Sequence, residues 1–194
     1  MHLSLVAALT ACVGELDDLQ AYELSTRGAL LNYLRRRCRS VATSEYLDGV
    51  VPGETRDGIR CEDVQRLSFA DASFDLCTST EVFEHVPNDR AGLRELHRVL
   101  KPRGHLLFTV PLTGNQTTLE RARLDGGNIV HMQPPTFHGD RLGGPGSVLV
   151  YRDYGQDILE RVRECGFDDA ILWVPQHAFM SHTRGVIVAQ RKSG

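Results

Sequence analysis

The chain has 194 residues, of which 41% are hydrophobic, and its formal net charge is −3. This length and composition suit one α/β domain with a full-sized core, and the slightly acidic balance argues against a nucleic-acid partner. No segment approaches the ~20 consecutive apolar residues of a membrane-spanning helix, so no membrane partner is expected.

The first 18 residues are expected to form an N-terminal helix that packs on the domain. The string L-T-A-C at residues 9–12 is similar to a bacterial lipoprotein cleavage box. However, Met1 and His2 supply no Lys or Arg, and the apolar run is short for a secretory signal. The five cysteines are odd in number and contain no C-x-x-C pair, which favours a reduced, cytoplasmic protein.

The apolar pattern predicts strands that alternate with helices. Amphipathic helices are expected at residues 29–38, 89–100 and 158–165. Strands are expected at residues 20–24, 40–44, 59–61, 74–79, 105–110, 170–174 and 185–190. This order predicts a Rossmann-like, doubly wound, mostly parallel seven-stranded sheet in a single domain of residues 1–194. Its last two strands should pair antiparallel at one edge, because no helix long enough to cross over joins them.

A long insertion, residues 111–150, interrupts the alternation after the fifth strand. It is rich in Gly, Pro and Asn and far exceeds the usual ~4–6-residue connection. Such segments are usually lids or binding loops, so we expect this one to fold over the carboxyl ends of the strands. His138 is then the first candidate for a proton acceptor facing a substrate, and His131 is the second.

Acidic side chains stand where several predicted strands end. Glu23, Glu45 and Asp63 each follow a strand, and the Thr80–Glu81 corner follows another. Ligands of open α/β sheets bind outside the carboxyl ends of the strands. These residues therefore predict a ligand site at that edge, against the alternative that they are solvated loop carboxylates or helix caps.

The segment 62–111 resembles the middle of a class I S-adenosylmethionine-dependent methyltransferase. It reads E-D-V-Q-R-L-S-F-A-D-A-S-F-D-L, then E-V-F-E-H, and after a helix R-V-L-K-P-R-G-H-L-L-F-T-V-P. These strings are similar to the small-molecule branch, methyltransferase type 11. The resemblance implies an enzyme that moves a methyl group from S-adenosylmethionine to a small molecule.

The resemblance also implies which residues hold the cofactor. Glu45 would accept hydrogen bonds from the ribose hydroxyls. Asp63 would accept one from the adenine amino group, with the Val64 backbone N–H beside the ring. The remaining cofactor-binding candidates lie in the first loop and at the end of the fourth strand: Glu23, Ser25, Gly28 and Thr80.

The first loop departs from the pattern of this family, which has alternating glycines there. Residues 23–28 read E-L-S-T-R-G, with one displaced glycine. Arg27 pairs with the cofactor carboxylate in one interpretation and fills the pocket in the other. In the second case the chain would be a methyltransferase-like binding or scaffold module without catalysis.

A third candidate base, His85, follows Glu81 and Glu84 in the turn after the fourth strand. If the turn is helical, the three side chains share one face and His85 acts as a base or orients a substrate. The alternative is that His85 only forms hydrogen bonds with backbone groups.

No metal is expected, because the spacing of His131, His138 and Asp140 is irregular and no Cys joins them. A nicotinamide-dependent oxidoreductase is disfavoured, because G-x-G-x-x-G is absent after the first strand.

Overall fold

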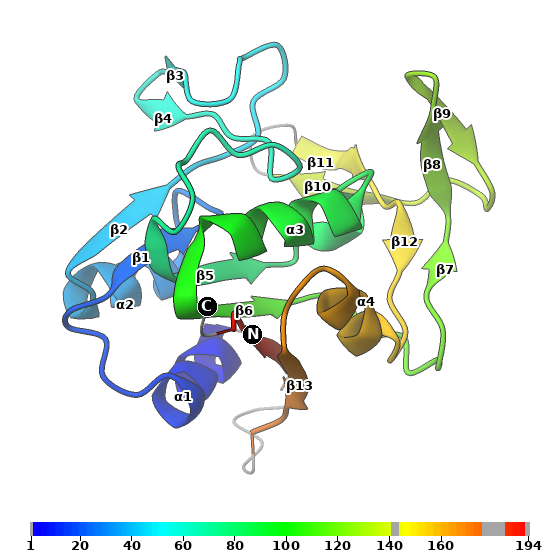
Figure 1. The fold of residues 1–194 in the computed structure, drawn as a ribbon. Helices are drawn as coiled ribbons and strands as arrows, with labels where there is room; N and C mark the ends of the chain where they lie inside the picture. Colours follow the sequence, from blue (N-terminus) through cyan, green and yellow to red (C-terminus); the bar gives the residue numbers. More distant parts are fainter. Residues whose placement is uncertain (1, 141–143, 176–184, 193–194) are drawn as a thin grey trace.

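A six-stranded sheet forms the centre of the computed structural model, which describes residues 2–140, 144–175 and 185–192 (Figure 1). The strand order is β13-β14-β6-β5-β1-β2, in which β2, β1, β5 and β6 pair in parallel. β14 runs antiparallel to both of its neighbours. The strands are β1 (Gln20–Glu23), β2 (Ser40–Thr43), β5 (Phe74–Thr80), β6 (Leu100–Thr109), β13 (Asp169–Trp173) and β14 (Val186–Gln190).

The predicted α/β class and the antiparallel pairing of the last two strands are confirmed. The described part of the sheet has six strands, however, where seven were expected. Residues 59–61 do not join it as a full strand. Instead β4 (Ile59–Arg60) forms a hairpin with β3 (Thr55–Arg56) across Asp57 and Gly58, both at positive φ. The D-G pair favours this tight turn, and only one bridge, between Glu45 and Cys61, links the segment to β2.

Helices cover both faces of the sheet. On one face α3 (Asp89–Val99) and α4 (Ile158–Glu164) supply Leu93, Leu96 and Val162 to one buried cluster. On the other face α1 (His2–Cys12) and α2 (Ala29–Arg37) supply leucines to a second cluster. Successive residues of a strand point to opposite faces, so Leu76 and Cys77 of β5 lie in different clusters although both are fully buried.

None of the helices in the described ranges is long and apolar enough to cross a membrane. The helix α3 begins where the side chain of Asn88 accepts a hydrogen bond from the backbone N–H of Ala91 at 3.1 Å. An asparagine at this position satisfies a backbone N–H that has no partner within the helix.

The insertion after β6 consists largely of short antiparallel pairs. The hairpin of β8 and β9 projects away from the sheet (Figure 1), and β10 pairs with β11 in a second hairpin. Residues 141–143 of the insertion lie outside the described residues. The strands are β7 (Leu119–Glu120), β8 (Ala122–Asp125), β9 (Asn128–His131), β10 (Phe137–Asp140) and β11 (Gly144–Leu149), followed by β12 (Arg152–Asp153), which pairs with β7.

A buried guanidinium joins β12 to the short 3₁₀ turn η1 (Phe83–His85) that follows β5. Arg152 donates to the carbonyl oxygens of Phe83 at 3.0 Å, Val86 at 2.6 Å and Pro87 at 2.7 Å. Its Nε donates to Glu120 at 3.1 Å. The side chain of Arg152 is only 3% exposed, so these acceptors take the place of water.

The buried carboxylate of Asp89 extends this network to α4. It accepts hydrogen bonds from the hydroxyl of Tyr154 at 3.0 Å and from Arg161 at 2.9 Å. The Nε of Arg152 lies 3.7 Å from the same carboxylate oxygen. The end of the insertion, α3 and α4 are therefore held together by one network of charged hydrogen bonds.

A second buried acid, Glu23, ends β1 and is 2% exposed. Burial is the main cause that raises the pKa of Glu23 to about 8, the nearby charge of Glu45 raises it further, and a hydrogen bond from the Thr78 hydroxyl opposes the shift. Glu23 is therefore mostly neutral near pH 7, which lets a carboxyl group lie under the first loop without a cation.

We expect Arg152→Met to lower the free energy of unfolding by about 3–5 kcal/mol, because the carbonyl groups of Val86 and Pro87 lose their charged donor and Asp89 loses one of its two arginines. Urea denaturation measures the change. Arg123→Met is the control, since that side chain is 62% exposed and, among the described residues, its ion pair is with Asp125. A loss below about 1 kcal/mol for Arg152→Met, equal to that expected of the control, would contradict the role given to this network.

Glu23 should make stability fall as pH rises. Its usual pKa of 4.5 rises to about 8 on folding. The stabilisation of the folded state by the neutral acid is therefore complete below about pH 4.5 and is lost toward about pH 8, by up to about 1.4 kcal/mol per pH unit. Glu23→Gln removes the titration, so wild type should lose stability relative to this variant between about pH 5 and pH 8. Urea denaturation at both values measures this, with exposed Glu15→Gln as the control. If the difference in unfolding free energy between wild type and Glu23→Gln were the same at both pH values, the raised pKa of Glu23 would be refuted.

Candidate functional site

The loops that follow β1, β2, β5 and β6 meet at the carboxyl edge of the parallel strands. The backbone N–H of Leu24 donates to the carbonyl of Thr78 at 3.0 Å, and that of Glu81 donates to Thr109 at 3.0 Å. Most of the residues predicted to hold a cofactor lie in these loops or at the strand ends: Glu23, Ser25, Gly28, Glu45 and Thr80.

The first loop is held closed by Glu45. Its Oε1 accepts hydrogen bonds from the backbone N–H of Thr26 at 2.9 Å and from the Thr26 hydroxyl at 2.7 Å. Gly28 precedes α2 with φ 117°, a conformation that favours glycine. Arg27 is exposed and Ser25 is half-buried. A carboxylate on β2 thus holds the backbone where the family pattern has extra glycines.

Asp63 follows a segment that pairs with the chain just after β2, through a bridge between Cys61 and Glu45. The backbone N–H of Glu45 donates to Arg60, and its carbonyl accepts from Glu62 at 3.0 Å. Asp63 Oδ1 accepts from the backbone N–H of Gln65 at 2.9 Å, and Val64 between them is buried. The fold therefore places the backbone of Glu45 beside the segment that leads into Asp63 and Val64.

Three hydroxyl groups near the ends of β5 and β6 are buried without a hydrogen-bond partner in the described part of the chain: those of Ser79, Thr80 and Thr109. Thr80 and Thr109 stand opposite each other in the register of the two strands. Buried hydroxyls normally have partners, so these orphaned groups fit a polar ligand at the carboxyl edge.

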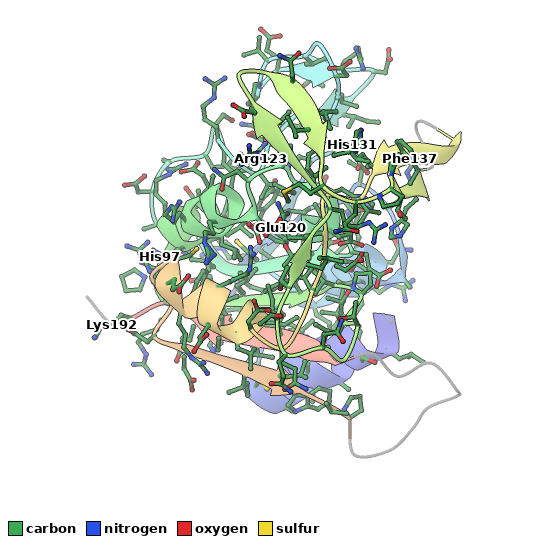
Figure 2. The ribbon with its side chains drawn as sticks, turned by 90° about the vertical axis from the view of Figure 1, so that its right-hand side faces the viewer. His97, Glu120, Arg123, His131, Phe137 and Lys192 are labelled. Atoms are coloured by element: carbon green, nitrogen blue, oxygen red, sulfur yellow. The ribbon has the colours of Figure 1, made fainter. Side chains whose placement is uncertain are left out.

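The structure brings two of the three predicted catalytic histidines into contact. The Nδ1 atom of His138 on β10 lies 3.2 Å from Nε2 of His85 in η1, and the two rings meet edge to face at 81°. His131 does not join them. It is exposed and belongs to β9 in the projecting hairpin, as Figure 2 shows.

The tautomer of His85 follows from its other nitrogen. Nδ1 lies 2.9 Å from the carbonyl oxygen of Leu149, which can only accept a hydrogen bond. Nδ1 therefore carries the proton. In the neutral ring, Nε2 keeps its lone pair and accepts from the Nδ1–H of His138.

Glu84 completes this cluster, although the sequence assigned it no role. Its side chain is 2% exposed, and Oε1 lies 3.7 Å from His85 Nε2. Neither carboxylate oxygen has a hydrogen-bond partner among the described residues. Burial raises the pKa of Glu84 to about 7. The E-H pair at the end of the motif E-V-F-E-H could have pointed to Glu84 in the sequence. The groups that surround this pair, however, come from residues far along the chain.

A separate polar groove of about 560 Å³ opens between the start of α3 and the insertion. It contains none of the residues predicted for cofactor or catalysis. Figure 2 shows Glu120 and Arg123 on the same side of the molecule. The groove is lined by Gln65, Pro87, Asn88, Asp89, Arg90, Glu120, Arg123, Leu124, Arg152 and Arg161.

Comparisons with known proteins bear on the family and the fold of this chain. Residues 25–108 match the sequence model of a family described as Methyltransferase domain. An arsenite methyltransferase from Aquipseudomonas alcaligenes is 28% identical over 152 residues, which cover 78% of this chain and 36% of that protein. The curated relatives are much longer, since the chain spans only 20%, 36% and 22% of their lengths.

Two solved structures share the fold over nearly the whole chain. An S-adenosylmethionine-dependent methyltransferase from Mesorhizobium loti superposes with a TM-score of 0.63 at 18% identity, covering 97% of this chain and 98% of that one. A Burkholderia thailandensis N-methyltransferase with bound 1,6-didemethyltoxoflavin and S-adenosylhomocysteine superposes with a TM-score of 0.58 at 17% identity, covering 98% and 78%. The resemblance drawn from the sequence is thereby supported: residues 25–108 match the methyltransferase-domain family, and the chain has the fold of these S-adenosylmethionine-dependent methyltransferases.

Proposed function

We propose that this chain binds S-adenosylmethionine at the carboxyl edge of the sheet and transfers a methyl group to a small-molecule acceptor. The observation that carries the proposal is the arrangement at this edge. Glu45 holds the first loop closed, the segment that carries Asp63 pairs beside it, and Arg27 of the loop is exposed. Relatives whose names state arsenite as substrate, or whose structure holds a small heterocycle, support an acceptor of this size.

The proposed cofactor contacts follow from the groups at this edge. Glu45 uses Oε1 for Thr26, so a ribose hydroxyl would donate to Oε2. Asp63 would accept the adenine amino group, with the backbone N–H of Val64 beside the ring.

The other end of the cofactor would lie near the first loop. Ser25 and Gly28 would face it, and the orphaned hydroxyl of Thr80 offers a further polar contact. Glu23 is mostly neutral near pH 7 and would pack against the buried side of this loop.

When bound, this cofactor supplies an electrophilic methyl group on a positively charged sulfur. The chain must then align the acceptor and exclude water. We propose that His138 and His85 face the acceptor, where the lone pair on Nε2 of His85 takes a proton from an oxygen or nitrogen directly or through His138. Residues 111–150 would cover the site, with His131 as a second contact from the hairpin.

We also propose that the protein works in a reducing compartment. All five cysteines are free thiols, which supports the cytoplasm as its location. The net charge of −3 gives no support for a nucleic-acid substrate.

Glu45→Gln and Asp63→Asn should each weaken binding of S-adenosylhomocysteine by roughly 10- to 100-fold, because each replaces a charged acceptor of a ligand hydrogen bond by a neutral one. Isothermal titration calorimetry measures the affinity. Asp125→Asn on the exposed hairpin is the matched control and should bind like wild type. If wild type itself shows no binding at millimolar ligand, the chain is a methyltransferase-like binding or scaffold module instead.

A further inference from the structure

We propose that Glu84, His85 and His138 form a binding site for one divalent transition-metal ion, with Zn²⁺ as the probe. One ligand atom from each of these residues lies within 4.8 Å of the others. The sequence had led us to expect no metal, and it grouped His138 with His131 and Asp140. The described residues give a different set, because η1 and β10 meet in the fold.

The separations suit a small metal ion. His85 Nε2 lies 3.2 Å from His138 Nδ1 and 3.7 Å from Glu84 Oε1. Two ligands that bind zinc tetrahedrally at ~2.0–2.1 Å lie ~3.3 Å apart. The third pair, Glu84 and His138, lies within 4.8 Å, so an ion that binds between the three atoms would draw these two side chains together.

His85 is already oriented as metal-binding histidines usually are. Its Nδ1–H donates to the carbonyl of Leu149, which directs the lone pair of Nε2 toward the cluster. The turn that carries it is rigidly held, because the backbone N–H of Tyr151 donates to the carbonyl of Glu84 at 2.8 Å and Arg152 binds the carbonyls of Phe83 and Val86. The ligand would need little reorganisation to bind an ion.

The carboxylate of Glu84 supplies a second, independent observation. Its side chain is 2% exposed, yet neither oxygen has a hydrogen-bond partner among the described residues. A buried carboxylate without a partner is costly, and a divalent cation is a partner that would offset this cost. The charge of Arg152 is near Glu84, but this guanidinium directs its hydrogen bonds to backbone carbonyls and Glu120 and forms none with Glu84.

Two imidazoles and one carboxylate favour zinc, iron, cobalt or nickel over magnesium or calcium. Three protein ligands leave at least one coordination position open, as in catalytic rather than structural sites. His138 is exposed, so an acceptor molecule can reach this position. With an ion bound, Nε2 of His85 is a ligand, so the ion would activate an acceptor oxygen in place of the free lone pair. This role rests on the proposed methyl transfer, whereas metal binding itself does not.

Metal titration of the full chain tests the proposal. After dialysis against a chelator, wild type should bind one equivalent of Zn²⁺ by calorimetry, and Co²⁺ should give the visible absorption of a nitrogen- and oxygen-bound ion. His138→Ala and Glu84→Gln should each weaken Zn²⁺ binding at least about 10-fold. Because His138 lies on an exposed strand, its variant tests the site even if Glu84→Gln does not fold.

His131→Gln and His97→Gln are the matched controls and should bind Zn²⁺ like wild type. His97 lies on α3, where its ring packs against Phe167. His131 lies on the projecting hairpin (Figure 2). Unchanged binding in His138→Ala, or an equal loss in His131→Gln, would overturn the site. A chain that binds Zn²⁺ but not S-adenosylhomocysteine would refute the proposed function and leave this inference standing.

Discussion

The buried guanidinium of Arg152 joins the end of the insertion to the turn after β5. It donates to three carbonyl groups of residues 83–87, where a 3₁₀ turn leaves backbone acceptors without helical partners. Water cannot reach these acceptors, so the charged donor is what allows the turn to be buried. The positions of Glu84 and His85 therefore depend on a residue far from them in the chain.

Asp89 balances the positive charge that this arrangement buries. Arg152 and Arg161 both approach its carboxylate, and Tyr154 donates a hydrogen bond to it. The same residue begins α3, so the network also fixes the helix behind the turn. Removal of one member takes a charged partner from the buried groups that remain, and for this reason the insertion and the sheet are energetically coupled.

The acidic side chains at the C-terminal ends of the parallel strands have different roles, because their surroundings differ. Glu23 is buried against Thr78 and is mostly neutral near pH 7. Glu45 is half-buried and closes the first loop through Thr26. This bond explains how a loop with one glycine keeps a compact shape. The missing glycines weakened the resemblance in the sequence, whereas the contact that replaces them joins residues on two different strands.

Local patterns in the sequence determined the α/β class, most helices and strands, and the acidic residues at the strand ends, because periodicity and caps act within a few residues. The tertiary structure alone decided that residues 59–61 form a hairpin, that His138 and not His131 meets His85, and that Glu84 is buried beside them. His85 and His138 are separated by an insertion whose path is set by packing and by the hydrogen bonds of Arg152. No local pattern encodes a contact between such distant residues, since it forms only when the whole sheet and its insertion have folded.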